Sequence, residues 1–472
     1  MVFSSIPFLF FFLPLFFLLY YLVPFRVKNY ILLIFSLVFY AWGEPIYIFL
    51  MVLSSVIDYS IGRLMDYYDR VPWKRVCLLC ASIFANLSIL GFFKYADFFI
   101  ETINSIANLS IPALNLPLPI GISFFTFQTM SYSIDLYRRE VKVEKNFFTF
   151  MTYVSMFPQL IAGPIVRFST VNQELHYRNI GFKGFYRGSF RFLQGLIKKV
   201  LLANQMGALW NTIQGQPYGE ISVVTAWFGA IAFTLQLYFD FSAYSDMAIG
   251  MGEMMGFHYL ENFDYPLFAK SVTEFWRRWH ISLSTWFRDY VYIPLGGNRK
   301  GIGRQICNIA IVWFLTGMWH GASWNYILWG VYYGVLLILE KFIWGKALKK
   351  LPRILQHVYT FFIVVVGFTV FVFEDLGKLG QYAKQMIGMA GNHLAGTEFL
   401  YHFRNYGVLF LSCMVLAMPV YPWVMKRIVR LKQNWIGGMI KGGFVLGYVV
   451  LFVLVVAFLV SDTYNPFLYF RF

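Results

Sequence analysis

Charge is scarce in this sequence: only 13% of its 472 residues are Asp, Glu, Lys or Arg, whereas 59% are hydrophobic. Soluble domains carry about 25% charged residues, so a string of soluble domains is excluded. At about 20 residues per membrane crossing, the apolar residues suffice for about ten or more spans. The sequence therefore predicts an all-α polytopic membrane protein.

Several signatures of soluble enzymes are also missing. The chain contains no GxSxG motif, no phosphate-binding loop and no pair of histidines at metal-ligand spacing. Cys77 and Cys80, one helical turn apart in an apolar run, are typical of buried small side chains, with a zinc or redox pair as the alternative. The net charge of +16 is explained by basic loops facing anionic lipid. We therefore expect membrane lipid as a partner, and no nucleic acid, bound metal or bound cofactor.

Apolar runs recur about thirteen times along the chain, the first near residues 6–24 and the last near 443–460. Several are too short or too broken to span, so we expect re-entrant pieces that are buried in protein or line water. The first run lacks a basic region and a cleavage site, which favours a retained span over a signal peptide. Basic loops such as 426–441 mark the cytoplasmic side, and counting from them places both termini outside the cytoplasm.

The same pattern predicts how the chain is divided. Residues 1–442 are expected to form one helical core, without an internal repeat or a low-complexity segment. Residues 443–472 are expected to form a final transmembrane helix followed by an extracytoplasmic aromatic tail.

Residues 275–290 form the densest polar and aromatic stretch of the chain, with three Trp and three Arg. Arginine binds phosphate through two fixed donors, and an aromatic ring can stack on a base. We take Trp276, Arg277 and Arg278 as candidates for substrate binding. The alternative is an amphipathic helix at the membrane interface, with Trp among the lipid headgroups.

His320 lies in the apolar stretch 313–325, where an ionisable side chain is costly and often marks a pathway or a reaction site. The alternative is a core histidine bonded to a carbonyl. Gly317 and Gly321 flank His320 at a spacing that lets a neighbouring helix or a thin acyl ligand approach. Trp319 and Asn325 complete the candidate substrate-binding residues.

Other polar side chains in apolar surroundings indicate a hydrated interior cavity, although helix–helix hydrogen bonding explains most of them equally well. They are Gln128, Ser131, Asp135, Gln159, Gln236, Asp240, Ser242, Ser245 and Asp246.

The motif WRRWHISL at 276–283, followed by WFRDY at 286–290 and by WHG at 319–321, resembles the membrane-bound O-acyltransferase superfamily. Three further motifs resemble its bacterial branch, the membrane subunits that O-acetylate alginate or peptidoglycan: YIPLGGNR at 292–299, YFDFSAYSD at 238–246 and GISFFTFQ at 121–128. The resemblance implies a ring of transmembrane and re-entrant helices around a central tunnel, in which a cytoplasmic acyl donor meets an acceptor from the other face.

The resemblance also implies roles for two residues. His320 matches the catalytic histidine of the family, and His280 matches the second polar position of its site. A neutral imidazole can take the proton of a hydroxyl as that hydroxyl attacks a thioester, and burial helps to keep His320 neutral. The function implied is O-acetylation of an exported cell-envelope polysaccharide from acetyl-CoA, as in alginate biosynthesis. The implied setting is the bacterial cytoplasmic membrane, with an extracytoplasmic esterase-like acetyltransferase as partner.

The final residues, FLYFRF at 467–472, are similar to the FxYxxF tail of the small membrane partner in teichoic-acid D-alanylation. An interfacial aromatic anchor is one interpretation. The other is that Tyr469 accepts the acyl group and relays it to an external transferase. A phenolic ester suits this role because its leaving group has a pKa near 10.

Two alternative functions differ in class or in donor. A transporter or channel could use the same polar cavity, but transport does not need a Trp-flanked pair of histidines at this spacing. D-alanyl transfer to teichoic acid would use a carrier-protein thioester. The PLGGN residues at 294–298 and the tail carried on the same chain favour acetylation.

Overall fold

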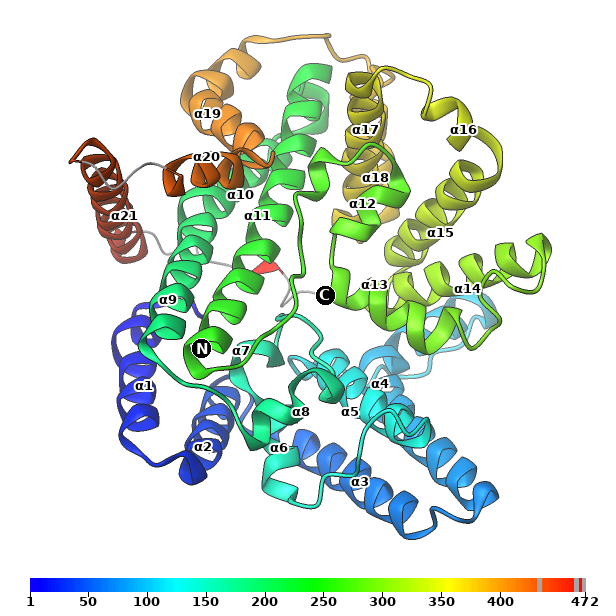
Figure 1. Ribbon diagram of the computed structural model, residues 1–472. Coiled ribbons are helices and arrows are strands. Elements are labelled where there is room, and N and C mark those ends of the chain that lie inside the picture. The colour runs from blue at the N-terminus through cyan, green and yellow to red at the C-terminus, as the bar shows by residue number, and fades with distance from the viewer. Residues whose placement is uncertain (431–434, 462–466, 469–472) are drawn as a thin grey trace. The chain divides into compact units, whose positions relative to one another are not determined.

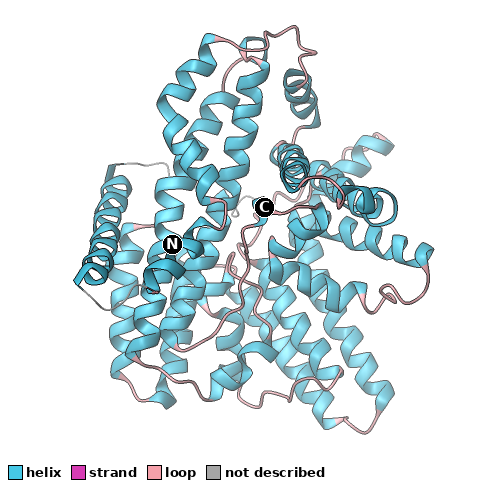
Figure 2. Ribbon diagram, turned by 45° about the horizontal axis from the view of Figure 1, so that its top comes forward, coloured by secondary structure: helices cyan, strands magenta, loops and turns pink. Residues whose placement is uncertain are grey.

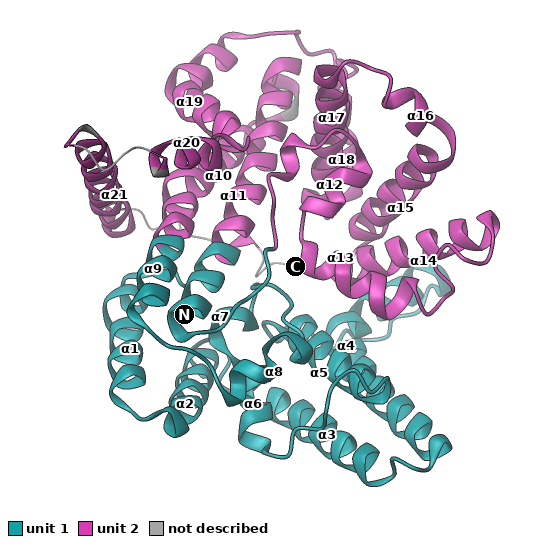
Figure 3. Ribbon diagram, in the orientation of Figure 1, with its two compact units in different colours: residues 1–192, 245–261, 469–472 teal, residues 193–244, 262–468 magenta. Residues whose placement is uncertain are grey.

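The computed structural model describes residues 1–430, 435–461, 467 and 468, and within them the chain forms helices and loops but no strands (Figures 1 and 2). Its internal contacts separate two compact units, coloured in Figure 3. Unit 1 contains residues 1–192 and 245–261, and unit 2 contains the described residues among 193–244 and 262–468. The predicted all-α membrane fold is confirmed, whereas the central tunnel and the division at residue 442 remain predictions.

Unit 1 is built largely from the N-terminal helices. They are the π-helical segment Phe8–Phe12 and the helices α1 (Leu13–Leu22), α2 (Phe25–Gly43), α3 (Ile48–Tyr67), α4 (Pro72–Ala107), α5 (Ile122–Tyr137), α6 (Phe147–Ser155), α7 (Phe157–Leu160), α8 (Phe168–His176) and most of α9 (Phe182–Ile197). The last part of α11 (Val223–Met255) also belongs to this unit.

Unit 2 contains the remaining elements. They are α10 (Asn204–Gln214), the first part of α11, α12 (Val272–Arg278), α13 (Ile281–Phe287), α14 (Ile302–His320), α15 (Trp324–Leu339), α16 (Gly345–Leu348), α17 (Arg353–Val372), α18 (Leu376–Met386), α19 (Thr397–Leu416), α20 (Val420–Val429) and α21 (Trp435–Ser461). Short 3-10 turns lie at Tyr218–Glu220 and Pro266–Phe268, and π-helical segments at Lys198–Ala203, Arg288–Tyr292 and Glu340–Trp344.

Seven helices in the described part of the chain are long and apolar enough to cross a membrane, or eight if the bent pair α19 and α20 forms one span. The pair is bent by 71°, at a break that the sequence analysis does not predict. α11 is largely buried, whereas α21 is mostly exposed, as expected for a core helix and a lipid-facing helix. The chain is a multi-pass membrane protein with fewer spans than its apolar runs.

The first apolar run illustrates the difference. It forms one short apolar helix over Phe8–Leu22. Its 15 residues are about 22 Å long at 1.5 Å per residue, less than the hydrocarbon thickness of about 30 Å. The run is therefore shorter than the seven candidate spans, and the expected first span remains a prediction. The run at 147–166 is broken as expected, because the chain leaves the helical conformation at Met156 before the short α7.

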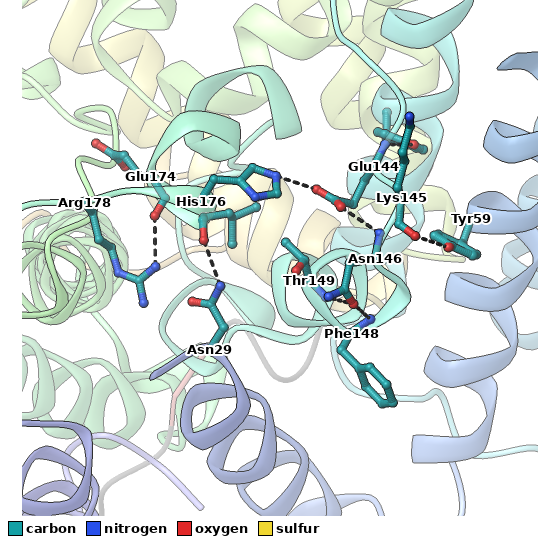
Figure 4. Close-up of polar contacts among 12 residues, drawn as sticks. Asn29, Tyr59, Glu144, Lys145, Asn146, Phe148, Thr149, Glu174, His176 and Arg178 are labelled. Carbon is teal, nitrogen blue, oxygen red and sulfur yellow. Dashed lines mark hydrogen bonds and ion pairs between the residues drawn. The ribbon is translucent and has the colours of Figure 1, made fainter. Parts of the chain in front are cut away.

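Polar contacts pin the short helices of unit 1 (Figure 4). The side chain of Asn146 caps α6 by accepting a hydrogen bond from the Phe148 N–H at 2.9 Å. The backbone carbonyl of the preceding residue, Lys145, accepts a hydrogen bond from the Tyr59 hydroxyl on α3 at 2.6 Å. Glu144 lies 2.8 Å from Nε2 of His176 at the end of α8. One loop therefore ties three helices of the unit together.

Some polar side chains inside the described part of unit 1 bond to neighbouring helices, whereas both amide atoms of Gln128 are buried without a hydrogen-bond partner. The buried carboxylate of Asp58 on α3 accepts hydrogen bonds from Ser82, from Asn86 at 2.7 Å and from Ser133 at 2.9 Å. Gln159 Nε2 donates to the Tyr153 carbonyl at 2.6 Å. For the bonded side chains helix–helix hydrogen bonding explains the polar pattern without a hydrated cavity.

Candidate active site

α12 is fixed at its N-terminus by one hydroxyl and one carboxylate. Ser271 caps the helix by accepting from the Glu274 N–H at 3.0 Å. The buried carboxylate of Glu340, from the end of α15, accepts from the backbone N–H groups of Val272 at 2.8 Å and Thr273 at 3.0 Å. A negative charge is favourable at a helix N-terminus. The cap holds the α12 motif against α15, although Glu340 is distant in the sequence.

His280 occupies the turn between α12 and α13. Its backbone is left-handed, with φ of 45°, which is uncommon for a residue other than glycine. The Asn262 Oδ1 atom accepts from the Ser282 backbone N–H at 3.2 Å and the Ser282 hydroxyl at 2.9 Å. Because a backbone N–H can only donate, the atom that faces it is the Asn262 oxygen.

The same Asn262 oxygen lies 3.2 Å from His280 Nδ1. The ring must therefore donate through Nδ1, which places the lone pair of the neutral imidazole on Nε2. Burial lowers the pKa of His280 to about 3, since the charged form loses its hydration. His280 is thus a neutral hydrogen-bond acceptor with a fixed tautomer.

His320 ends α14 and is 6% exposed. Its ring packs edge-on against Trp329 and Phe371, with centroids at 4.9 and 5.2 Å. Trp319 lies between the two histidines, 5.9 Å from the His280 ring and 5.0 Å from the His320 ring. Aromatic rings therefore surround much of the His320 ring.

α14 and α15 pack closely because they meet through glycines. A Cβ at Gly317 would collide with the Tyr326 carbonyl, and one at Gly330 would collide with the Trp313 carbonyl. A Cβ at Gly321 would collide with the Tyr326 ring. Of the two expectations for the Gly317 and Gly321 spacing, close approach of a neighbouring helix is the one observed.

A cavity of about 630 Å³ lies within unit 2, between α12, α13, α14 and α15. Both His280 and His320 line it, together with Arg277, Arg288 and Ser284. The volume is in the range of small-molecule sites. Residues 40 positions apart in the chain thus face one space that combines two imidazoles with two guanidinium groups.

Of the other predicted site residues, two line the cavity, and Arg278, Trp319 and Asn325 do not. Trp276 and Arg277 line the cavity, and Trp276 Nε1 is buried without a hydrogen-bond partner in the described part of the protein. Arg278 instead pairs with Glu274 at 2.7 Å. Trp319 is buried beside the histidines, and Asn325 is buried and donates to the Phe371 carbonyl at 2.8 Å. Tyr469 lies outside the described residues.

Two residues of the site have no clear signal in the sequence, and a third, Arg288, has one that the site prediction did not use. Asn262 and Glu340 act through contacts with residues 18 or more positions away. Arg288 lines the cavity and lies in the WFRDY motif, so its place in the dense polar stretch could have indicated it.

Comparison with known proteins identifies the family of this chain. The model of the membrane-bound O-acyltransferase family matches residues 136–373, which contain both histidines and the cavity. The protein named "Probable alginate O-acetylase AlgI" from Pseudomonas aeruginosa is 43% identical over 383 residues, covering 80% of this chain and 73% of that protein.

Two further relatives carry different names. The peptidoglycan O-acetyltransferase of Helicobacter pylori is 35% identical over 451 residues, covering 85% of this chain and 83% of that protein. The teichoic acid D-alanyltransferase of Bacillus subtilis is 29% identical over 289 residues, covering 55% of this chain and 70% of that protein. With the cavity lined by its two histidines, these matches show that the chain belongs to the membrane-bound O-acyltransferase family and is an O-acyltransferase.

Proposed function

We propose that the protein takes acetyl from cytoplasmic acetyl-CoA and passes it across the membrane for O-acetylation of an exported cell-envelope polysaccharide. The observation that carries the proposal is that His280 and His320 line one cavity with Arg277 and Arg288. The names of relatives that match at least 80% of this chain, an alginate O-acetylase and a peptidoglycan O-acetyltransferase, support this class of substrate.

In the proposed reaction His320 is the general base. Its imidazole takes the proton of an acceptor hydroxyl while the hydroxyl oxygen attacks the acetyl carbonyl of the thioester. The C–S bond breaks, an ester forms, and the coenzyme A thiolate leaves and takes the proton back from His320. Aromatic surroundings support this role, because they favour the neutral imidazole that can act as a base.

His280 has a different task. With its proton on Nδ1 and its lone pair on Nε2, it can accept a hydrogen bond from the acceptor hydroxyl or from an amide of the donor. It cannot donate from Nε2 to an oxyanion while it remains neutral. We therefore assign His280 to orientation of the reactants and His320 to proton transfer.

Arg277 and Arg288 are suited to the donor. Guanidinium groups bind phosphate through paired donors, and coenzyme A carries phosphates at the end remote from its thiol. Trp276 lines the same cavity and contributes an aromatic ring to its wall. Arg288 is also paired with Asp289 at 2.7 Å, so Arg277 is the stronger candidate for the phosphates.

The acetyl group then has to leave the membrane. We propose that Tyr469 is the acceptor hydroxyl and hands the acetyl group to an extracytoplasmic esterase-like transferase, with both termini of the chain on that side of the bacterial cytoplasmic membrane. The burial of Phe467 and Leu468 within unit 2 supports a tail that enters the protein instead of anchoring in lipid.

D-alanyl transfer from a carrier-protein thioester is the second candidate function. The match to the teichoic acid D-alanyltransferase, which covers 55% of this chain, favours it less than the longer matches favour acetylation. A transporter is disfavoured by the family assignment.

The test is acetylation of polysaccharide by His320→Ala in vesicles that contain the partner and radiolabelled acetyl-CoA. Loss of a general base predicts a fall of about 10²–10⁴-fold. His357→Ala is the matched control, because His357 is a partly buried histidine of unit 2 outside the cavity lining. Wild-type acetylation by His320→Ala would refute the catalytic role, and transfer of D-alanine instead of acetyl would favour the second candidate.

A further inference from the structure

An ion pair is buried inside unit 2, and neither of its two residues lines the cavity. The Lys199 ammonium lies 2.7 Å from Asp240 Oδ1, and the two side chains are only 3% and 2% exposed. Lys199 belongs to the π-helical segment Lys198–Ala203, and Asp240 lies near the middle of α11. Asp240 is one of the polar residues that the sequence places in apolar surroundings.

A buried ion pair is weak evidence of a stabilising role, since the cost of removing both charges from water offsets much of their attraction. An apolar pair of similar volume could pack the same two helices. Isolated π-helical turns are also often found at functional sites. Both observations call for a role of the pair beyond packing.

The contacts of the second carboxylate oxygen indicate that role. Asp240 Oδ2 accepts a hydrogen bond from the backbone N–H of Leu468 at 2.9 Å. The ring of the preceding residue, Phe467, packs at a tilt of 34° against the ring of Tyr244, with centroids 4.7 Å apart, and the Lys199 ammonium lies 5.9 Å from the Phe467 ring. Asp240 and Tyr244 are one helical turn apart on α11, so they face the same side.

The two tail residues are well enclosed at this point. Phe467 is 5% exposed and Leu468 is 8% exposed. A tail that served as an interfacial anchor would place its aromatic ring among lipid headgroups. The ring instead lies on a tyrosine and beside an ammonium group, both within unit 2.

We propose that Lys199, Asp240 and Tyr244 form a seat that holds the chain at residues 467–468 and so positions the following residue, Tyr469. The carboxylate binds the backbone of Leu468 and the Lys199 ammonium orients that carboxylate, while Tyr244 and Lys199 bind the ring of Phe467. The seat's purpose rests on the proposed relay through Tyr469, but its existence as a docking site does not. Its three members are positioning residues and take no part in bond making.

The seat divides its recognition between backbone and side chain. A carboxylate that accepts from a backbone N–H would accept the same bond from any residue except proline at position 468. The aromatic ring at position 467 is the part that depends on the side chain, because the tilted contact with the Tyr244 ring and the cation–π attraction to Lys199 both need it. Phe467 is therefore expected to matter more for docking than the side chain of Leu468.

Docking can be measured on the full chain through a thiol at Leu468→Cys, in a background in which Cys77, Cys80, Cys307 and Cys413 are replaced. The readout is the rate of reaction with a maleimide in detergent. Two charge-neutral double variants form a matched pair, Lys199→Met with Asp240→Asn and Lys199→Met with Asp240→Leu. Both remove the charges, but only the asparagine variant keeps an oxygen that can accept from the N–H of residue 468.

We expect the thiol to react at least about tenfold faster in the leucine double variant than in the asparagine double variant, because a released segment opens more readily than a docked one. Equal, slow labelling in both folded double variants would overturn the seat. Phe467→Ala gives a second route that leaves the buried helices unchanged, and the thiol should again react faster. Unchanged labelling in Phe467→Ala would show that the ring is not held.

Polysaccharide acetylation separates the seat from the relay. Faster labelling together with a loss of acetylation in the leucine double variant supports both proposals. Faster labelling with undiminished acetylation keeps the seat as a docking site and refutes the relay. Tyr469→Phe completes the design, since it should leave the labelling rate unchanged whether or not the relay is correct.

Discussion

Asn262 offers a direct test of the site because a single oxygen fixes the state of His280. We compare Asn262→Leu, which removes the acceptor, with Asn262→Asp, which keeps an oxygen in place and adds a negative charge. In the native protein this oxygen accepts from His280 Nδ1 at 3.2 Å and from two groups of Ser282 at 3.2 and 2.9 Å.

The leucine variant leaves the Nδ1–H of His280 buried without its acceptor. Such a donor costs about 1–3 kcal/mol of unfolding free energy. A ring that is no longer held can move by about 1 Å, which is enough to lower kcat by about 100-fold. We expect a lower melting temperature and this loss of kcat, with a smaller change in KM for acetyl-CoA.

The aspartate variant tests the charge state of His280. The native pKa of His280 is about 3, below the ordinary value of 6.5, so the unfolded chain binds more protons below pH 6.5. His280 therefore lowers the free energy of unfolding as the pH falls from 6.5 toward 3, by about 1.4 kcal/mol per pH unit. A carboxylate beside Nδ1 raises the pKa of His280 by about 1–3 units. We expect Asn262→Asp to lose less unfolding free energy than the wild type as the pH falls. We also expect the acid limb of its pH–rate profile to move to higher pH.

The assays are melting temperature between pH 5 and pH 8 and the pH profile of acetyl-CoA cleavage. Ser282→Ala is the control, because it removes a hydroxyl that lies 3.4 Å from His280 Nδ1 and donates to the Asn262 oxygen, but keeps that oxygen 3.2 Å from Nδ1. Wild-type kcat in a folded Asn262→Leu variant would refute the positioning of His280. An unchanged pH profile in Asn262→Asp would refute its assignment as a neutral acceptor in the reaction.

The remaining predictions concern packing, donor binding and the relay. Gly317→Val should lower the melting temperature by the equivalent of about 1–3 kcal/mol, because its side chain meets the Tyr326 carbonyl, and thermal scans in detergent check this. Arg277→Ala should raise KM for acetyl-CoA by about tenfold, the effect of losing a charge-assisted hydrogen bond of roughly 1.5 kcal/mol. Arg278→Ala should leave this KM unchanged. Equal changes of KM in the two variants, measured by steady-state kinetics, would contradict the assignment of Arg277 to the donor. Tyr469→Phe should abolish polysaccharide acetylation, and wild type incubated with acetyl-CoA should show an acetyl adduct on its C-terminal peptide by mass spectrometry.

The residues that could be predicted from the sequence are those whose signal is local. His280 and His320 lie within dense runs of Trp and Arg, and an ionisable group in an apolar run is itself informative. The cavity brings both together with Arg277 and Trp276, which were taken from the same runs. Arg278 follows Arg277 directly, yet a side chain one position along a helix points about 100° away, and its partner is Glu274.

Local composition was less reliable for counting spans. Hydropathy alone does not distinguish a lipid-facing helix from an apolar helix that is covered by protein. α5 is buried along almost its whole length, and its 16 residues place it below the length of a span. The helix over Phe8–Leu22 is also shorter than the candidate spans, but only one of its faces is covered: Phe8 and Phe12 pack on Phe39 and Phe157, whereas Phe11 and Leu18 are exposed. Apolar content therefore gave an upper limit on the number of spans.

Residues whose role depends on distant partners could not be predicted. Lys199 closes a basic run, so a loop position at the membrane surface is the natural interpretation, but its ammonium is buried on Asp240. Asp240 in turn binds a backbone N–H that lies 228 residues further along the chain. A backbone donor has no residue type, so no sequence pattern marks Leu468 as its source. Asn262 has the same property, since two of its three donors are identified only once the turn after His280 is folded. In this site, sequence identifies the groups that carry charge or protons, and the fold alone identifies the groups that hold them in one protonation state and one position.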